Sequence, residues 1–216
     1  MKRLLLAIAS LLLVAGCYGS SDMTPAPVVE LDPEIPPNFT TYTSEGLFSI
    51  SYPPDLVPDI EFIDELSENA KETMKTTDPE VTLEGTRYVF LGHIPIEGGS
   101  YGYVLISVGP MPAGRTLDEW VEEECQYERN NQPGFLVYSQ AKTVFDGSAA
   151  TILEYRTWGL DTGEERNVDL FTVKDGLLWE VGCSAKPEYF RDYEDTFYSI
   201  LSSFRILTNW RSRWTM

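Results

Sequence analysis

Four strand-forming segments follow one another in the last third of the chain, and turn sequences join them. The segments are residues 135–144, 149–158, 165–173 and 177–184. The first turn is Asp146-Gly147, the last is Asp175-Gly176, and the Asp-Thr-Gly sequence at 161–163 forms the middle one. An Asp-Gly pair between alternating apolar residues is among the better short-range signals of a β-hairpin. The pattern therefore predicts consecutive antiparallel strands.

The rest of the chain is predicted to add three strands and three helices. Strands are expected at residues 48–52, 86–93 and 101–108, and amphipathic helices at 59–76, from 116 onward and from 187 to 204. The second helix opens with Thr116-Leu117-Asp118-Glu119, a capping-box sequence. Strands in mostly antiparallel order with long helices between them predict one α+β domain, in which α-helices cover an antiparallel β-sheet.

The N-terminus has the layout of an export signal. Lys2 and Arg3 precede a mostly apolar run at residues 4–14, and small residues follow it. The apolar run is about half as long as a membrane-spanning helix. Its closing sequence, LVAGC at 13–17, resembles the lipobox of bacterial lipoproteins. That resemblance implies removal of residues 1–16 and attachment of a diacylglyceryl group to Cys17, which would anchor the protein because two acyl chains hold stably in a bilayer.

The segments on either side of the predicted domain differ from it in composition. Residues 17–41 contain five prolines among small and acidic residues without periodicity, which is typical of a tether. The domain itself is expected at 42–207. The tail at 208–216 holds two tryptophans and two arginines, which are favoured at binding hot spots. We favour the alternative that this tail folds back on the acidic surface of its own domain.

Charge excludes some classes of partner. The formal net charge is −18 for 216 residues, while 43% apolar and 12% aromatic residues suffice for a real core. Binding to nucleic acid is not expected, because phosphate neutralisation by Lys and Arg supplies much of that affinity. Anionic lipid headgroups are disfavoured for the same reason. We expect a monomer that meets the membrane only through the lipid on Cys17.

Two cysteines remain once Cys17 is assigned to lipid. Cys125 and Cys183 form an even pair in a protein predicted to be exported, so they are candidates for a disulfide. The bridge would close a loop of 58 positions (183 minus 125) and contribute about 4 kcal/mol on the chain-entropy model. The alternative is two separate buried thiols. We expect the disulfide.

No catalytic, cofactor or metal site can be assigned from the sequence. His93 is the single histidine and is expected at the end of a strand. A serine triad would have to use His93, and a zinc site needs several Cys or His ligands. Cys125 follows three glutamates, which oppose thiolate formation. Gly98-Gly99 stands apart from any phosphate-loop motif.

Carboxylates are numerous enough to keep two further classes of site open. The Asp-Thr-Gly-Glu-Glu sequence at 161–165 is the closest to a calcium loop, but it lacks the alternating ligands of an EF-hand. We expect a hairpin turn there. A carboxylate pair for glycoside hydrolysis depends on separation in space, which the sequence does not supply.

Several segments resemble PsbP-like proteins, and together they extend over residues 42–207. They are GLFSISYPPDL at 46–56, TLDEWVEEE at 116–124, KTVFDGSAATILEY at 142–155 and DLFTVKDGLLWEVGCSAKPEYFRDYEDTFYSILSSFRI at 169–206. The resemblance implies an antiparallel β-sheet sandwiched by α-helices, and a role in binding or assembling protein partners. The helix at 59–76 is longer than the usual connection in that family. No residues match the metal positions of its photosynthetic members.

The leading hypothesis is a lipid-anchored module that faces the periplasm or cell exterior. It would bind an envelope protein or a small ligand, or help to assemble an envelope complex, without catalysis and without a cofactor. One alternative is a hydrolase of envelope polymers that uses two carboxylates. Another is a calcium-dependent structural subunit.

Replacing Cys17→Ser tests the anchor. Serine lacks the thiol that receives the diacylglyceryl group, so the variant should move from the membrane fraction to the soluble fraction. Cell fractionation followed by immunoblotting measures the shift, and Cys125→Ser is the matched control because Cys125 carries no lipid in this interpretation. A Cys17→Ser protein that stays on membranes would exclude the lipid as the sole anchor.

Overall fold

Two antiparallel sheets and two long helices make up the described part of the chain. The computed structural model describes residues 31, 34–44, 46–59, 62–63, 86–96, 98–159 and 163–207. Its elements are β1 Thr40–Ser44, β2 Phe48–Tyr52, β3 Val57–Pro58, β4 Arg87–Ile96, β5 Ser100–Pro110, α2 Leu117–Asn131, β6 Leu136–Phe145, β7 Ser148–Gly159, β8 Gly163–Lys174, β9 Leu177–Ala185, α3 Pro187–Ser203 and β10 Arg205–Ile206. The small sheet has the order β1-β2-β10, and the large one β3-β4-β5-β9-β8-β7-β6. The predicted α+β class is confirmed.

Tight turns connect the strands as the sequence predicts. Asp146 and Gly147 have φ values of 48° and 77°, and Asp175 and Gly176 have 56° and 81°. Two successive positive φ values match the right-handed twist of the flanking strands. The turns set the register, since strand pairing begins immediately on both sides of each one.

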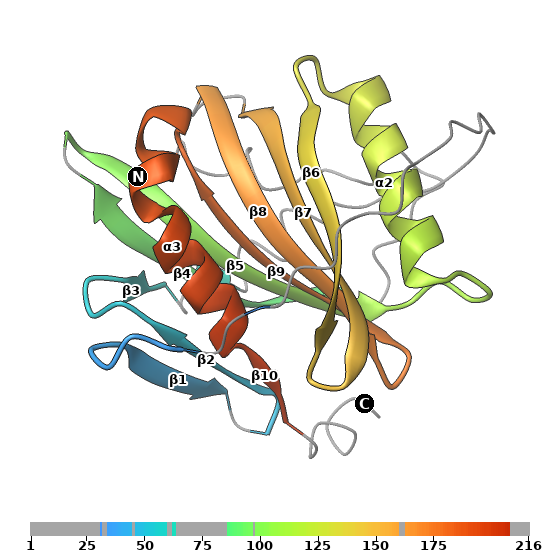
Figure 1. Cartoon of the computed structure of the whole chain (residues 1–216), viewed down its shortest axis with the longest axis horizontal. Helices are drawn as coiled ribbons and strands as arrows, with labels where there is room; N and C mark the ends of the chain where they lie inside the picture. The colour runs from blue at the N-terminus through green and yellow to red at the C-terminus, as the bar shows by residue number, and fades with distance from the viewer. Residues whose placement is uncertain are drawn as a thin grey trace.

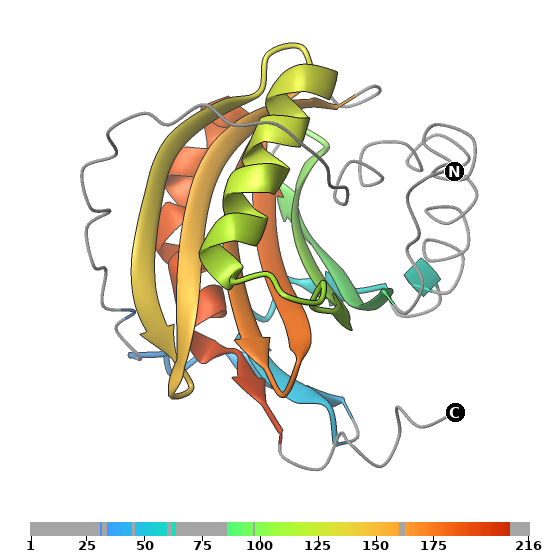
Figure 2. The ribbon, with the colours of Figure 1, turned by 90° about the vertical axis from the view of Figure 1, so that its right-hand side faces the viewer.

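The two helices cover opposite faces of the large sheet (Figures 1 and 2). On β8, Leu170 points into the core beneath α3, whereas its neighbour Phe171 packs with Trp120 of α2. We call these the main core and the second core. Successive side chains of a strand point to opposite faces, so β7, β8 and β9 contribute alternate residues to each core. The sandwich of helices around the sheet is therefore confirmed.

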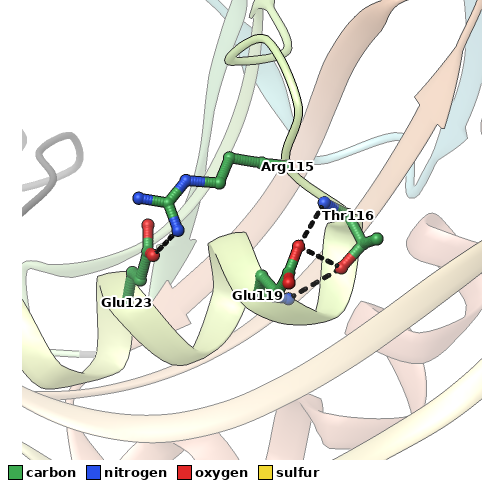
Figure 3. A network of polar contacts seen from close by, with 4 residues as sticks. All are labelled: Arg115, Thr116, Glu119 and Glu123. Carbon is green, nitrogen blue, oxygen red and sulfur yellow. Dashed lines mark hydrogen bonds and ion pairs between the residues drawn. The ribbon is translucent and has the colours of Figure 1, made fainter. Parts of the chain in front are cut away.

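A capping box starts α2 at Thr116, as predicted (Figure 3). The Glu119 backbone N–H donates to the Thr116 hydroxyl at 3.3 Å, and the Thr116 backbone N–H donates to the Glu119 carboxylate at 2.8 Å. These bonds satisfy helix N–H groups that otherwise have no partner. They also favour the ionised carboxylate, and so lower the pKa of Glu119. Arg115 and Glu123 form an ion pair one turn further along.

Three details differ from the sequence-based expectations. β1 begins at Thr40, inside the predicted tether, and Leu31 and Phe39 pack against the main core. β4 continues to Ile96, so the expectation that His93 ends a strand was wrong. β3 pairs with β4 at Gly92 and His93, whereas residues 94–96 of β4 pair with β5. Pro95 is tolerated in this strand because a proline can lie where its missing N–H faces no partner strand.

Several predictions fall on residues outside the described ranges. They are the signal at 1–16, Cys17, most of the tether, the tail at 208–216 and the helix at 59–76, of which only Phe62 and Ile63 are described and helical. Among the helices that the structure describes, none is both long and apolar enough to cross a membrane.

The predicted disulfide is wrong in this structure, because the sheet separates the two cysteines. Cys183 lies on β9 in the main core beneath α3, and Cys125 lies on α2 in the second core. Both are free thiols and both are buried. A bridge requires the two Cα atoms to lie within about 7 Å, which side chains on opposite faces of a strand layer do not allow. The alternative of two separate buried thiols holds instead.

Thiol counting tests this arrangement. The Cys17→Ser protein, unfolded in denaturant without reductant, should add two alkyl groups, one on Cys125 and one on Cys183. Intact-protein mass spectrometry measures the increase, and a reduced sample provides the reference mass. A mass that alkylation leaves unchanged would demonstrate a disulfide and contradict the two-face arrangement.

Candidate functional site

Three large apolar side chains are exposed together at the free end of the large sheet. Leu136, Tyr138 and Trp158 are 46%, 48% and 58% exposed, and we call them the edge patch. Leu136 pairs with Arg156, and Trp158 lies two residues further along β7, so both point to the side that α3 occupies. α3 packs on β8 and β9, so β6 and β7 extend past it (Figure 1). The patch is exposed because the helix does not reach it.

A bulge in β6 and one arginine fix the position of Tyr138. The register shifts between Val137 and Ser139, which leaves Tyr138 without a directly opposite partner. The guanidinium of Arg166 lies 5.3 Å from the Tyr138 ring and 4.6 Å from the ring of Phe190 on α3. Cation–π contacts of this length hold rings in place. The bulge therefore aims Tyr138 toward α3.

The charges around the edge patch compensate one another. Arg166 forms an ion pair with Glu154, and Arg156 lies 3.6 Å from Glu164. Arg156 also donates from Nε to the carbonyl oxygen of Gly134 at 3.1 Å. The surroundings of the patch are thus close to neutral in a chain whose net charge is −18. Tyr, Trp and Arg are enriched at binding hot spots, so this surface has the composition of a protein contact.

The opposite face of the sheet buries a pair of carboxyl groups. The Tyr155 hydroxyl donates to Asp169 Oδ2 at 2.6 Å, and the Ser107 hydroxyl donates to Glu180 Oε2 at 2.8 Å. Gly182 lies opposite Asp169 in the register, and a Cβ there would come within 2.7 Å of Asp169 Oδ1. Only glycine leaves room for this carboxyl group.

Burial favours the protonated form of both carboxyl groups. Burial raises the pKa of Asp169 well above its usual value, and the charge of Glu180 adds to the increase. Burial also raises the pKa of Glu180 to about 7, against the opposing effect of the Ser107 hydrogen bond. Raised carboxyl pKa values are typical of general acids. Asp169 and Glu180 are both buried, however, whereas a hydrolase must present its carboxyls to a polymer.

The structure separates the residues that the sequence singles out. Cys125 and Cys183 lie on opposite faces, and burial raises the pKa of the Cys125 thiol to about 12, so it is a poor nucleophile. Of the possible calcium loop, Asp161 lies outside the described residues and Glu164 faces Arg156. Within the described ranges, no group of three or more His, Cys, Asp or Glu side chains could hold a metal ion. The absence of a cofactor and of catalysis stays a prediction.

Sequence reasoning missed both the edge patch and the buried carboxyls. The signal for the carboxyls was their position, because Asp169 lies between Val168 and Leu170, and Glu180 lies between Trp179 and Val181. The edge patch had a weaker signal, since exposure of Leu136 and Trp158 depends on where α3 ends rather than on their own strands.

Solved structures of other proteins have a similar architecture. The solution structure of cyanobacterial PsbP (CyanoP) from Synechocystis sp. PCC 6803 is 15% identical and aligns over 78% of this chain and 92% of that one, with a TM-score of 0.50. The chain has a PsbP-like fold.

Two further structures align with this PsbP-like chain at lower scores. A Pseudomonas aeruginosa protein of unknown function is 12% identical, over 77% of this chain and 95% of that one, with a TM-score of 0.49. LpqN of Mycobacterium tuberculosis, which is involved in cell envelope biogenesis, is 10% identical over 74% and 90%, with a TM-score of 0.43. No protein-family model matches the chain, and neither does any curated protein.

The buried carboxyls predict a stability that depends on pH. The folded state raises the pKa of Glu180 from 4.5 to about 7, so it keeps a proton that the unfolded state releases. The free energy of unfolding should therefore fall as the pH rises from about 4.5 to 7. Glu180→Gln keeps an acceptor for Ser107 and should reduce this fall by about 2 kcal/mol.

Urea denaturation at a series of pH values measures this effect. Glu188→Gln is the matched control, because Glu188 is exposed on α3 and its replacement should leave the profile unchanged. If Glu180→Gln and wild type lose stability equally between pH 4.5 and 7, Glu180 does not hold the proton.

Proposed function

We propose that this protein is a lipid-anchored, extracytoplasmic binding module that docks a protein partner on its edge patch. The observation that carries the proposal is the exposure of Leu136, Tyr138 and Trp158 on one side of a sheet edge. Exposed apolar side chains that gather on one surface mark interaction sites more often than single exposed residues do. The lipid on Cys17 and the export signal supply the location in this proposal.

Charge and shape define the partner that fits this surface. Three apolar anchors suit an apolar or aromatic segment, because desolvation of large side chains supplies most of the affinity at protein contacts. The net charge of −18 repels acidic proteins and attracts basic ones at a distance. The partner is therefore an envelope protein that presents an apolar segment with basic residues beside it. The domain need not contact the bilayer.

The edge patch also favours binding over catalysis. Its polar groups are arginines already paired with glutamates, and such pairs orient a partner without transferring protons. The buried carboxyls on the other face are the groups with catalytic pKa values, and they lie away from this surface. A binding role requires no change in the exposed residues or in their ion pairs.

Trp158→Ala combined with Tyr138→Ala tests the docking surface. Because the two rings supply most of the apolar area of the patch, the double variant should bind its partner at least tenfold more weakly. The tagged domain is incubated with an envelope extract, the captured protein is identified, and its affinity is then measured with purified proteins. Binding should also weaken as salt rises if basic residues contribute.

Val144→Ala is the matched control for this experiment. Val144 is 72% exposed and lies on β6, the strand that also carries Tyr138. Its side chain points to the face that α2 covers, which is the same face on which Lys142 pairs with Asp118 of α2. Its replacement should leave the affinity unchanged. Equal affinities for wild type and the double variant would place the binding surface elsewhere.

A further inference from the structure

The underside of α2 carries a buried carboxyl group without a hydrogen-bond partner. Glu128 is 5% exposed, and neither of its carboxyl oxygens has a donor within reach. A buried polar group normally finds a partner, because water can no longer satisfy it. Glu128 lies one turn from the C-terminal end of α2, at Asn131. This unsatisfied group lies at the contact between the helix and the sheet.

The groups that face Glu128 add negative charge. On α2 itself, Glu124 lies one turn earlier and is also buried. Across the contact, the charge of Glu128 acts on Tyr155 of β7, whose hydroxyl donates to Asp169 of β8. Glu180 of β9 lies beside Asp169 and acts on it in the same way. An ionised Glu128 would therefore lie among other acidic groups and be repelled by them.

The positive charges on and around α2 act elsewhere. Arg129 is exposed, and its charge acts on the thiol of Cys125. Lys142 of β6 pairs with Asp118, and Arg115 pairs with Glu123. Both ion pairs hold the N-terminal half of the helix. In the C-terminal half, Cys125 belongs to the second core and Glu128 is buried without a hydrogen-bond partner.

We propose that α2 is a proton-gated clasp: its C-terminal half lies against the sheet while Glu128 is protonated, and it opens when Glu128 ionises. Opening gives the carboxylate access to water, which stabilises the ionised form. It also exposes the part of the second core that this half covers, including Cys125. This surface is on the other face of the sheet from the edge patch, so the clasp does not depend on the docking proposal.

The number of protons that the closed and open forms bind determines how the opening of α2 depends on pH. Burial, with a contribution from Glu124, raises the pKa of Glu128 from 4.5 to about 8 in the closed form. In the open form the carboxyl group is solvated and releases its proton near its ordinary pKa. Between about pH 4.5 and 8 the open form therefore holds one proton fewer, so each pH unit favours opening by up to about tenfold. Above pH 8 the equilibrium levels off.

Cys125 reports opening, and Cys183 provides an internal control. The Cys17→Ser protein is alkylated with iodoacetamide at pH 5.5, 6.5, 7.5 and 8.5. Each rate is divided by that of N-acetylcysteine at the same pH, which removes the ordinary titration of a thiol. The normalised rate at Cys125 should rise about 100-fold between pH 5.5 and 7.5, while Cys183, which only global unfolding exposes, should react far more slowly at every pH. Equal normalised rates at the two cysteines would indicate that both react through global unfolding, and would overturn the proposal.

Glu128→Gln separates the clasp from other effects of pH. Glutamine keeps the shape of the side chain and cannot ionise, so the normalised rate at Cys125 should stay near its value at pH 5.5. Glu122→Gln is the matched control, because Glu122 is exposed on the same helix, and it should follow the wild type. A Glu128→Gln protein that keeps the wild-type pH profile would overturn the proposal.

Hydrogen exchange of the wild type gives a second measurement that does not depend on any variant folding. After correction for the intrinsic pH dependence, amides in the C-terminal half of α2 should lose protection between pH 5.5 and 7.5. Amides of α3, which belong to the main core and exchange by global unfolding, should remain more strongly protected than those of α2 over the same range. Constant protection in α2 would show that the helix does not open, and would overturn the proposal.

Discussion

The central strands of the large sheet are buried on both sides, and this constraint governs the rest of the molecule. Residues 150–155, 167–172 and 178–181 are continuously buried on β7, β8 and β9. Strands of this kind are normally almost entirely apolar, yet Asp169 and Glu180 occupy inward positions here. With hydroxyl donors and no described cation beside them, these groups stay in the interior by keeping protons. The two-sided burial thus creates both the stable core and its sensitivity to pH.

The same two-sided layout separates the two surfaces that we assign to function. The edge patch is exposed because α3 covers β8 and β9 and stops short of β6. The second core is covered by α2, a helix that has ion pairs at one end and a buried carboxyl group without a hydrogen-bond partner at the other. One face therefore offers a permanent contact surface, and the other offers a surface whose exposure depends on protons.

Local patterns predicted the parts of this fold that depend on neighbouring residues. The Asp-Gly hairpins and the capping box at Thr116 are confirmed because turn chemistry and helix capping act over a few residues. The disulfide prediction was wrong because it depended on which face of the large sheet α2 covers. The sequence of α2 by itself does not determine that face. Glu124 and Glu128 continue the four-residue spacing of Trp120 on the buried side of α2. The spacing therefore indicates that both side chains are buried, whereas their charge favours exposure to solvent.

Buried acids also change the electrostatics of the whole surface. The formal charge of −18 counts every carboxyl group as ionised, whereas burial raises the pKa of Asp169 above its usual range and that of Glu128 to about 8. Near neutral pH Glu128 holds its proton, and burial favours the neutral form of Asp169. Both effects reduce the repulsion that a strongly acidic domain exerts on itself. Opening of α2 would return negative charge to the surface. A basic partner would therefore favour the open form, because its attraction grows with the charge that opening releases.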